Sequence, residues 1–536
     1  MKKILIKNGN IVDGTGERAY KGDILFDNHI LKISAHIDES DADEVHDARG
    51  LVVAPGFIDA HSHADLSVIG DKKQSFAICQ GITTQVTGLC GLGFVPLTKD
   101  KMIETMKYNA GLFGYQPEFD QYDFSSFERY MKLVDGAATN IAIAATHNAA
   151  RVAATGYTNK AEEKEERIIK MKQIIEEAMD AGCLGISTGL SYYPCAYADY
   201  DELREIATTI KRRDGIFLMH IRYPKPEEPY GALKEIIRLG LETKAKIHIL
   251  HYRTKYPLDY GHPEVLIDMF DKANQEGGNF TLETLPYLSG STFIHAILPA
   301  WVVEGGIEPT LERLKDPALR PRIIKEMQQL LNITALGNGK PPRFGHVGGF
   351  PEYSGQFIRD VARMRNQDMD EMLLDLMIAS RLDINYVGNE AEEDPEVSRI
   401  LMEDTMTLLR NPLYLVGSDA MPYGEYPHPR TYGCYARMLK LSREQNIPLE
   451  EMIAKLTAAP ARRLGMIDRG ELKVSRAADI VVFDDQKVKD NADFEHPTLP
   501  PSGIHYVFVN GQMAVENGVQ KEVYNGKVIR KNKQCL

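Results

Sequence analysis

The residues of this chain best suited to chemistry are histidines that follow short apolar runs. His61 and His63 lie in the segment 59–63, and alternation along an extended chain points them to the same side. His220 and His251 each end another apolar run. Neutral imidazole is the commonest nitrogen ligand of zinc, and a catalytic zinc keeps one position open for water. Four imidazoles at one place would therefore form a metal site.

Two further segments offer a thiol and a carboxylate. Cys90 stands between glycines in the segment 87–91, where its thiolate could ligate a metal or bridge two of them. Asp419 closes a Gly-Ser-Asp tripeptide, and its carboxylate could bind metal or move protons. His248 alternates with its strand and is predicted to be structural. For His147, a structural role and a contact with substrate both stay open.

Distant stretches of chain need a common framework to bring these residues together. Apolar strands alternate with helical stretches between residues 56 and 466, which predicts an α/β fold with a parallel sheet closed into a (β/α)8 TIM-like barrel. Eight strands are expected, at 56–60, 81–87, 140–145, 184–188, 216–219, 246–250, 280–286 and 414–417. Because active sites lie at the carboxyl ends of barrel strands, the candidate ligands are expected at one rim.

The two ends of the chain have a different sequence pattern from the middle. Residues 1–55 and 467–536 contain short strands and Asn-Gly turns, which predicts two parts of one small β-sandwich around the barrel at 56–466. The stretch from 288 to 413 is too long for a simple crossover after strand 7. An insertion is expected there, within about 288–350, as a lid or a wall of the pocket.

Composition excludes several classes of protein. The 536 residues are 43% hydrophobic and 26% charged, which is typical of a soluble globular protein rather than a disordered or membrane one. A net charge of -13 argues against binding nucleic acid, which requires clustered Lys and Arg. Six scattered cysteines and only a short apolar run near the start favour the cytoplasm. A small molecule is the expected partner, without membrane binding, and the oligomeric state is left open.

Taken together, these motifs resemble the D-aminoacylase, or N-acyl-D-amino-acid deacylase, family of the amidohydrolase superfamily. The resemblance covers nearly the whole chain and is carried by the segments 55–63, 81–91, 185–192, 417–419, 428–430, 469–472 and 478–481. Some related barrels carry a bridging lysine on the fourth strand, whereas residues 184–190 contain none and Cys90 takes its place. The resemblance implies zinc-dependent hydrolysis of N-acyl-D-amino acids to a carboxylate and a free D-amino acid.

The resemblance also implies how the metal is held. One tight zinc would be bound by Cys90, His220 and His251. His61 and His63 would form a second site of weaker occupancy.

Further roles follow from the same resemblance. Asp419, also a candidate metal ligand, would be the general acid/base that accepts the proton of the water and returns it to the leaving amine. Arg430 matches the arginine that holds the substrate carboxylate, for which a guanidinium fork is well shaped. Arg253, Tyr192 and Tyr287 are the other expected substrate contacts.

Two alternatives to this function remain. A cyclic-amide hydrolase of the hydantoinase or dihydropyrimidinase type shares the barrel and the ligands, but the missing lysine and Arg430 count against it. A non-catalytic scaffold retaining the barrel would usually have lost ligands, and all six persist here. Tyr252 and Arg253 stand where the family often has His and Lys, and Leu285 where it often has Tyr. The preference for side chain and acyl group therefore stays open.

Overall fold

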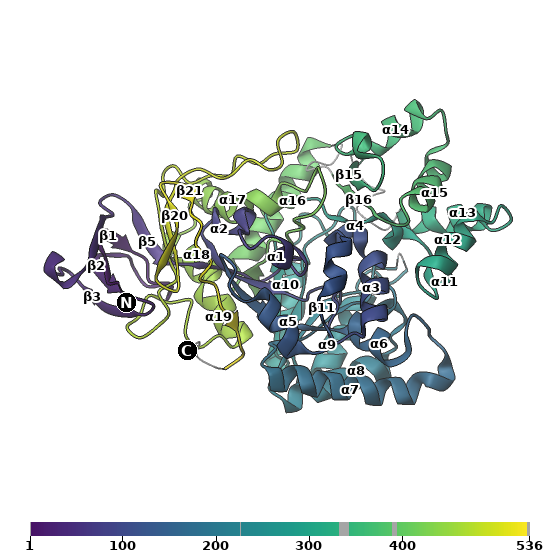
Figure 1. The fold of residues 1–536 in the computed structure, drawn as a ribbon, viewed down its shortest axis with the longest axis horizontal. Coiled ribbons are helices and arrows are strands. Elements are labelled where there is room, and N and C mark those ends of the chain that lie inside the picture. Colours follow the sequence, from purple (N-terminus) through teal and green to yellow (C-terminus); the bar gives the residue numbers. More distant parts are fainter. Residues whose placement is uncertain (1, 226, 332–341, 389–393, 533–536) are drawn as a thin grey trace.

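Parallel strands run through the middle of the molecule at the eight positions expected from the sequence. The structure is a computed structural model that describes residues 2–225, 227–331, 342–388 and 394–532 (Figure 1). The strands are β6 (Phe57–Asp59), β7 (Ile82–Thr87), β8 with β9 (Asn140–Ile143 and Ala145–Thr146), β10 (Gly185–Gly189), β11 (Ile216–His220), β12 (Lys246–Ile249), β13 (Phe280–Thr284) and β17 (Tyr414–Val416).

Two sheets make up this set of strands. β6, β7 and β8 pair in parallel, and so do β9 to β13 with β17. Only Ala144 separates β8 from β9, so one stretch of chain belongs to both sheets. Between β17 and β6 there is a single parallel bridge, Ser62 to Ala420, beside a hydrogen bond from Ser418 N to Asp59 Oδ1 of 2.9 Å. This strand order is the one expected of a (β/α)8 barrel, and the chain after the first strand meets the chain after the last one at the Ser62–Ala420 bridge, near the candidate ligands.

Helices follow the parallel strands along the chain. They are α1 (Ser67–Gly70), α2 (Ser75–Ile78), α3 (Lys99–Tyr108), α4 (Ala110–Phe113), α5 (Phe127–Val134), α6 (His147–Thr155), α7 (Lys164–Ala181), α8 (Tyr200–Arg212), α9 (Gly231–Thr243) and α10 (Glu264–Gln275), and then α16 (Pro395–Arg410), α17 (Arg430–Glu444), α18 (Leu449–Leu456) and α19 (Ala458–Leu464). The ends of α8 illustrate why they form. Asp199 caps its first turn by accepting from Glu202 N, and Lys211 and Arg212 complement the dipole in its last turn.

Both ends of the chain contribute to a nine-stranded sheet beside these elements. It contains β1 (Ile4–Ile11), β2 (Tyr20–Phe26), β3 (Ile30–Ser34), β4 (Glu44–Asp47) and β5 (Val52–Pro55), together with β18 (Ile480–Phe483), β19 (Ile504–Val509), β20 (Gln512–Glu516) and β21 (Val519–Gln520). The antiparallel pairing of β5 with β18 joins the two ends of the chain. The last strand, β22 (Val528–Ile529), leaves this sheet and pairs with β8.

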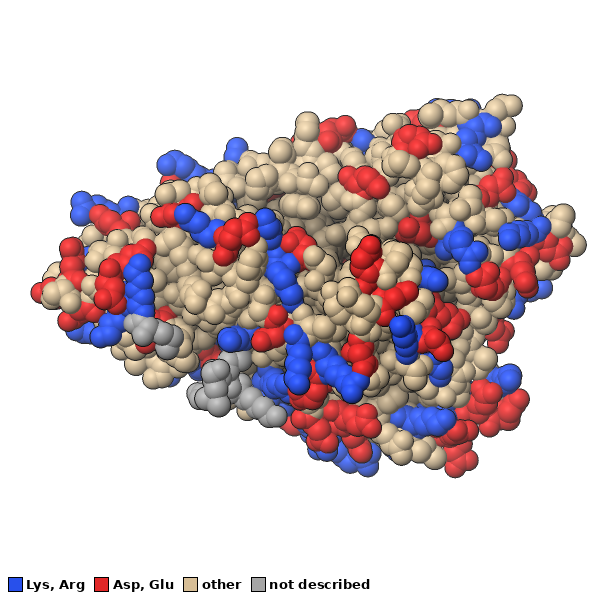
Figure 2. All heavy atoms as spheres, viewed as in Figure 1, with Lys and Arg blue, Asp and Glu red and all other residues tan. Residues whose placement is uncertain are grey.

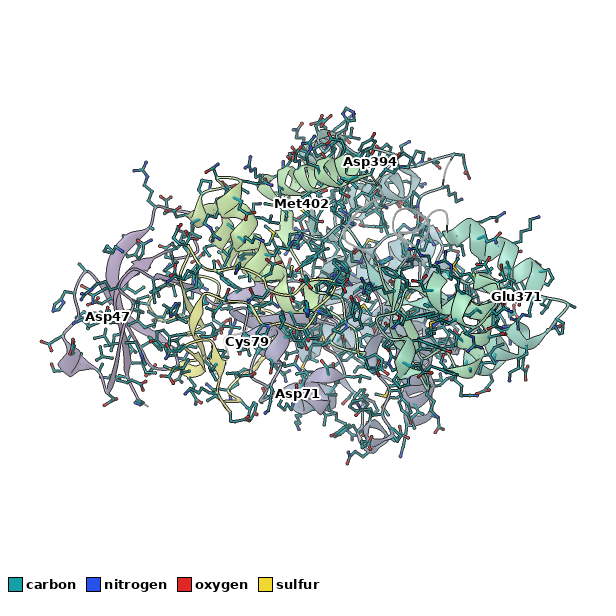
Figure 3. The ribbon with its side chains drawn as sticks, turned by 90° about the horizontal axis from the view of Figure 1, so that it is seen from above. Asp47, Asp71, Cys79, Glu371, Asp394 and Met402 are labelled. Atoms are coloured by element: carbon teal, nitrogen blue, oxygen red, sulfur yellow. The ribbon has the colours of Figure 1, made fainter. Side chains whose placement is uncertain are left out.

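The stretch after β13 forms a separate layer. Its strands β14 (Ser291–Phe293), β15 (Arg343–Val347) and β16 (Ile384–Val387) make a small antiparallel sheet, accompanied by α11 (Ala300–Val303), α12 (Ile307–Lys315), α13 (Arg320–Leu331), α14 (Ile358–Met364) and α15 (Met369–Ala379). This layer runs past residue 350 to Val387, and residues 332–341 of the expected insertion lie outside the described part. Figure 3 places Glu371 of the layer and Asp47 of the terminal sheet at opposite ends of the molecule.

The surface, the helices and the cysteines add three observations. Acidic and basic side chains are interleaved over the face drawn in Figure 2. None of the described helices combines the length and the apolar character that crossing a membrane requires. Five described cysteines are free thiols, and Cys535 lies outside the described residues.

Candidate metal centre

Imidazoles and a thiol from four strand ends meet inside the molecule. His61 Nε2 lies 3.3 Å from His63 Nε2 and 3.4 Å from Cys90 Sγ. The same sulfur lies 3.4 Å from His251 Nε2, and His220 Nδ1 lies 3.0 Å from that nitrogen. The structure therefore brings together all five predicted nitrogen and sulfur ligands.

Asp419 reaches the same place from the strand end after β17. Its Oδ1 lies 3.4 Å from His61 Nε2 and 3.2 Å from His63 Nε2. Its Oδ2 lies 2.9 Å from Arg430 Nη2. The carboxylate thus stands between the imidazoles and the predicted substrate-binding arginine.

The donors fall into two overlapping groups whose atoms lie within 4.8 Å of one another. Cys90 and His251 share one group with His61, and His61 shares the other with His63 and Asp419. The sequence instead predicts a tight set of Cys90, His251 and His220, whereas the structure groups the first two with His61 and places His220 beside His251. Which donors bind the tight ion stays a prediction.

Three of these donors have unusual backbone conformations. Cys90, His251 and Asp419 have φ angles of 52°, 36° and 52°, which non-glycine residues adopt rarely and at a cost of about 1–3 kcal/mol each. Each follows a strand by a few residues, so the strained turn aims its side chain across the strand ends. Strain concentrated at such positions is typical of a functional site.

The glycines that flank Cys90 permit its turn. Gly88 and Gly91 both have positive φ angles, 75° and 70°. A Cβ atom at Gly88 would lie 2.1 Å from the carbonyl oxygen of Ala144, and one at Gly91 would lie 2.5 Å from Gly189 N. Only glycine fits both positions. The turn that presents the Cys90 thiol therefore requires the glycines of the segment Gly-Leu-Cys-Gly.

The electrostatics of the cluster suit a metal cation. Burial lowers the pKa of His61 and of His251 to about 3 and holds that of His220 well below its usual value. These three imidazoles are therefore neutral, and His220 Nδ1 lies 3.0 Å from His251 Nε2. Burial also holds the pKa of the Cys90 thiol well above its usual value, so that a bound metal would be needed to give the thiolate.

Glu283, which sequence reasoning missed, orients one of these ligands. It is buried on β13 and accepts hydrogen bonds from His61 Nδ1 and, at 3.1 Å, from His248 Nε2. A proton held on His61 Nδ1 leaves Nε2 free as a ligand, as carboxylates often do for metal-binding histidines. A single acidic residue within an otherwise apolar strand was the sequence signal that could have identified Glu283. His248 is structural as predicted, since its Nδ1 contacts Thr281 Oγ1 at 2.7 Å.

His147 belongs to a buried charge cluster beside the strands. Its Nδ1 lies 2.8 Å from Thr188 Oγ1 and its Nε2 lies 2.8 Å from Glu202 Oε1. Arg151 also pairs with Glu202, and Arg167 lies 3.4 Å from it. With both ring nitrogens occupied and no exposed surface, His147 has the structural role.

Two of the predicted substrate contacts adjoin the cluster. Arg430 is 1% exposed, and its Nε has no hydrogen-bond acceptor among the described residues. The ring of Tyr192 lies 4.7 Å from that of His220, and its hydroxyl lies 3.1 Å from Thr292 Oγ1 on β14. The inserted layer therefore touches the site through Tyr192.

The other two predicted contacts interact with the chain itself. Arg253 donates to the carbonyl oxygens of Tyr287, at 2.7 Å, and Leu288. The Tyr287 side chain is fully buried, with the guanidinium of Arg437 4.4 Å from its ring centre and its hydroxyl directed at Gly433. Their roles in binding substrate stay predictions.

Known proteins are similar to this chain over most of its length. The profile of the amidohydrolase family matches residues 44–515. D-aminoacylase of Alcaligenes xylosoxydans is 30% identical over 512 residues, which are 95% of this chain and 93% of that protein.

Solved structures agree with this similarity. N-acyl-D-glutamate deacylase from Bordetella bronchiseptica, solved with zinc and a phosphonate inhibitor that mimics the tetrahedral intermediate, has a TM-score of 0.78 and 27% identity, and the match covers 99% of each chain. Dihydropyrimidinase from Brevibacillus agri is 15% identical with a TM-score of 0.57 over both whole chains, which shows a shared fold. These neighbours are TIM-barrel amidohydrolases.

Proposed function

The chain belongs to the amidohydrolase family, and from this premise we propose that it is a metal-dependent hydrolase of N-acyl-D-amino acids. It cleaves their amide bond to give a carboxylate and a free D-amino acid. The observation that carries the proposal is the position of Asp419, between two imidazoles of the cluster and the buried Arg430.

The metal is zinc, held by donors from the set His61, His63, Cys90, His220, His251 and Asp419. Thiolate and imidazole are the ligands that zinc prefers, and the buried, neutral imidazoles fit a divalent ion. When bound, zinc polarises the amide carbonyl and lowers the pKa of a water to about 7. One tight ion and a second, weaker one fit the two overlapping groups of donors.

Asp419 moves the proton of the reaction. Burial would raise the pKa of this carboxyl, but the charge of Arg430 holds it well below its usual value, so the group is ionised and able to accept a proton. It accepts the proton of the attacking water and returns it to the amine that leaves. An uncharged amide needs this transfer, because the free amide anion is a very poor leaving group.

Arg430 fixes the substrate. One of its nitrogens pairs with Asp419, while the buried Nε lacks an acceptor among the described residues. The α-carboxylate of the substrate supplies that acceptor, and a charge-assisted contact fixes the α-centre so that one enantiomer reaches Asp419. Tyr192, beside His220, packs against the bound substrate.

The most direct test of this function is a screen of N-acetyl and N-formyl amino acids in both configurations, scored by release of amine. We expect hydrolysis of the D-enantiomers with a free carboxylate, loss of activity with a chelator, and recovery with zinc. Turnover of hydantoins in preference to linear substrates would favour the cyclic-amide alternative. A purified protein without metal or turnover would favour the scaffold.

Two structural expectations accompany this function. We infer that the eight parallel strands close into a barrel and that the terminal strands form a β-sandwich from residues 1–55 and 467–536. The single Ser62–Ala420 bridge supports the closure, and the pairing of β5 with β18 supports a domain made from both ends. The cytoplasmic location expected from the sequence stays a prediction.

A further inference from the structure

The turn after β10 holds a hydroxyl group against a candidate zinc ligand. Ser191 lies two residues after the end of β10, and its Oγ forms a hydrogen bond with Nε2 of His220, the last residue of β11. The other ring nitrogen of His220, Nδ1, lies 3.0 Å from His251 Nε2 within the cluster. The imidazole of His220 therefore presents one nitrogen to the cluster and the other to Ser191.

Backbone hydrogen bonds hold the turn that carries Ser191. Leu190 N donates to the carbonyl oxygen of His220 at 2.9 Å, and Tyr192 N donates to that of Gly189 at 2.9 Å. The first bond ties the turn to the ligand residue, and the second closes the turn on the end of β10. The ring of Tyr192 also lies 4.7 Å from the ring of His220. The backbone thus places the hydroxyl beside the imidazole.

The same turn adjoins the segment that carries the candidate thiol ligand. A Cβ atom at Gly189 would lie 2.0 Å from the carbonyl oxygen of Cys90. Gly91 N donates to Ser187 Oγ on β10 at 2.9 Å. Every residue of β10 is described, and none of them belongs to the two groups of donor atoms. This strand and its turn therefore affect the cluster through the ligand segments that they contact.

The partner of one imidazole nitrogen decides whether the other nitrogen can bind a metal. A neutral imidazole carries one proton, so when Nε2 donates that proton to Ser191, Nδ1 of His220 keeps the lone pair that faces the cluster. Glu283 has the same effect on His61 with the two nitrogens exchanged. The buried Nδ1 of His63, by contrast, has no hydrogen-bond partner among the described residues. Orientation by a partner thus distinguishes His61 and His220 from His63.

We propose that Ser191 is a positioning residue for zinc, which accepts the Nε2 proton of His220 and so directs Nδ1 to the metal. This inference rests on the proposed function, because it takes His220 as a ligand of the tight ion. It deepens that function by naming a residue that sets the affinity for zinc. Hydrogen-bond partners of metal ligands typically change metal affinity by about 10- to 100-fold. Ser191 acts through His220 and needs no contact with the substrate.

The test measures the Kd of zinc by competition with a chromophoric chelator, after metal has been removed from the purified protein. Ser191→Ala should raise the Kd of the tight ion by about 10- to 100-fold, because His220 can then carry its proton on either nitrogen. Ser191→Thr keeps the hydroxyl group and should keep most of the affinity. Ser442→Ala is a matched control, since it removes a buried hydroxyl on α17 that donates to the carbonyl oxygen of Met438, and it should leave the Kd unchanged.

A double-mutant cycle separates an effect through His220 from a general effect on the structure. His220→Ala should itself weaken zinc binding, and adding Ser191→Ala should then weaken it by less than about twofold. An unchanged Kd in either single variant would overturn the inference, and so would equal losses with and without His220. The proposed function would stand in these cases if the wild-type protein still bound zinc and hydrolysed N-acyl-D-amino acids. A wild-type protein with neither zinc nor turnover would overturn both.

Discussion

Asp419 is the residue on which the chemistry depends most. Its two oxygens face different partners, since Oδ1 approaches His61 and His63 while Oδ2 pairs with Arg430. A single carboxylate thereby links the group that activates water to the group that holds substrate. A positive φ of 52° keeps it in that position.

Removing the charge of Asp419 should separate metal binding from catalysis. Asp419→Asn keeps the size of the side chain but cannot accept a proton, so kcat should fall by about 10²–10⁴-fold while bound zinc is retained. Metal analysis and steady-state kinetics on the same preparation measure both effects. Turnover near the wild-type level would remove Asp419 from the role of acid/base.

The prediction for Arg430 differs, because its proposed role is to bind the substrate carboxylate rather than to accept the proton of the water. Arg430→Met should reduce kcat/KM for N-acetyl-D-amino acids by about 10²-fold or more, as expected when a charged partner is lost. Analogues with an amidated carboxyl group should be much less affected. Equal losses for both kinds of substrate would contradict a carboxylate clamp.

At the residue scale, the sequence predicted that side chains would meet where each one stands at the end of a strand, and the structure does bring them together. His61, Cys90 and Asp419 could be found because the carboxyl ends of parallel strands meet at one face. Glu283 was missed because it meets His61 only in the folded sheet, 222 residues away in the sequence. Period-2 alternation shows which side of a strand a residue faces but not which neighbour it meets.

At the scale of elements, the loop after β7 depends on its glycines. Gly91→Ala would place a Cβ atom 2.5 Å from Gly189 N at a φ of 70°. The loop must shift, and Cys90 with it, so zinc content should fall together with stability. Gly50→Ala is a matched control, because it also has a positive φ, 82°, but meets no atom within 4 Å. A Gly91→Ala protein with full zinc content would show that the close approach is not needed.

The buried cluster on α6, α7 and α8 makes a prediction for stability. Burial alone would raise the pKa of Glu202, but His147 and Arg151 lower it to about 2. Glu202→Gln leaves buried positive charge unpaired and should reduce the free energy of unfolding by about 3–5 kcal/mol at pH 7. Urea denaturation measures this change, and a loss below about 1 kcal/mol would contradict the importance of the cluster.

The same cluster determines how the free energy of unfolding changes with pH. Because the pKa of Glu202 falls from 4.5 to about 2 on folding, its contribution is complete above pH 4.5 and is lost as the pH drops towards 2. Burial opposes a charged His147, but Cys195 and Glu202 raise its pKa from 6.5 to about 9. That contribution is present below pH 6.5 and is lost as the pH rises to 9. In Glu202→Gln, the free energy of unfolding should vary less with pH on both the acidic and the alkaline side. An unchanged pH profile of stability would contradict this assignment.

At the scale of the whole molecule, the order of elements was more predictable than their boundaries. Eight strands alternating with helices have a strong pattern, and all eight were found. The inserted layer runs to Val387 because β16 pairs with both β14 and β15. Pairing between strands so far apart in sequence leaves no local signal. For the same reason nothing in the sequence showed that β22 would leave the terminal sheet for β8.

The measurement that reaches the central claim most directly is X-ray absorption at the zinc edge on the purified protein. We predict bound zinc with one sulfur neighbour at about 2.3 Å and nitrogen neighbours at about 2.0–2.1 Å, and loss of the sulfur signal in Cys90→Ser but not in Cys195→Ser. A protein without zinc, or zinc surrounded by nitrogen and oxygen alone in the wild type, would contradict a catalytic centre assembled around Cys90.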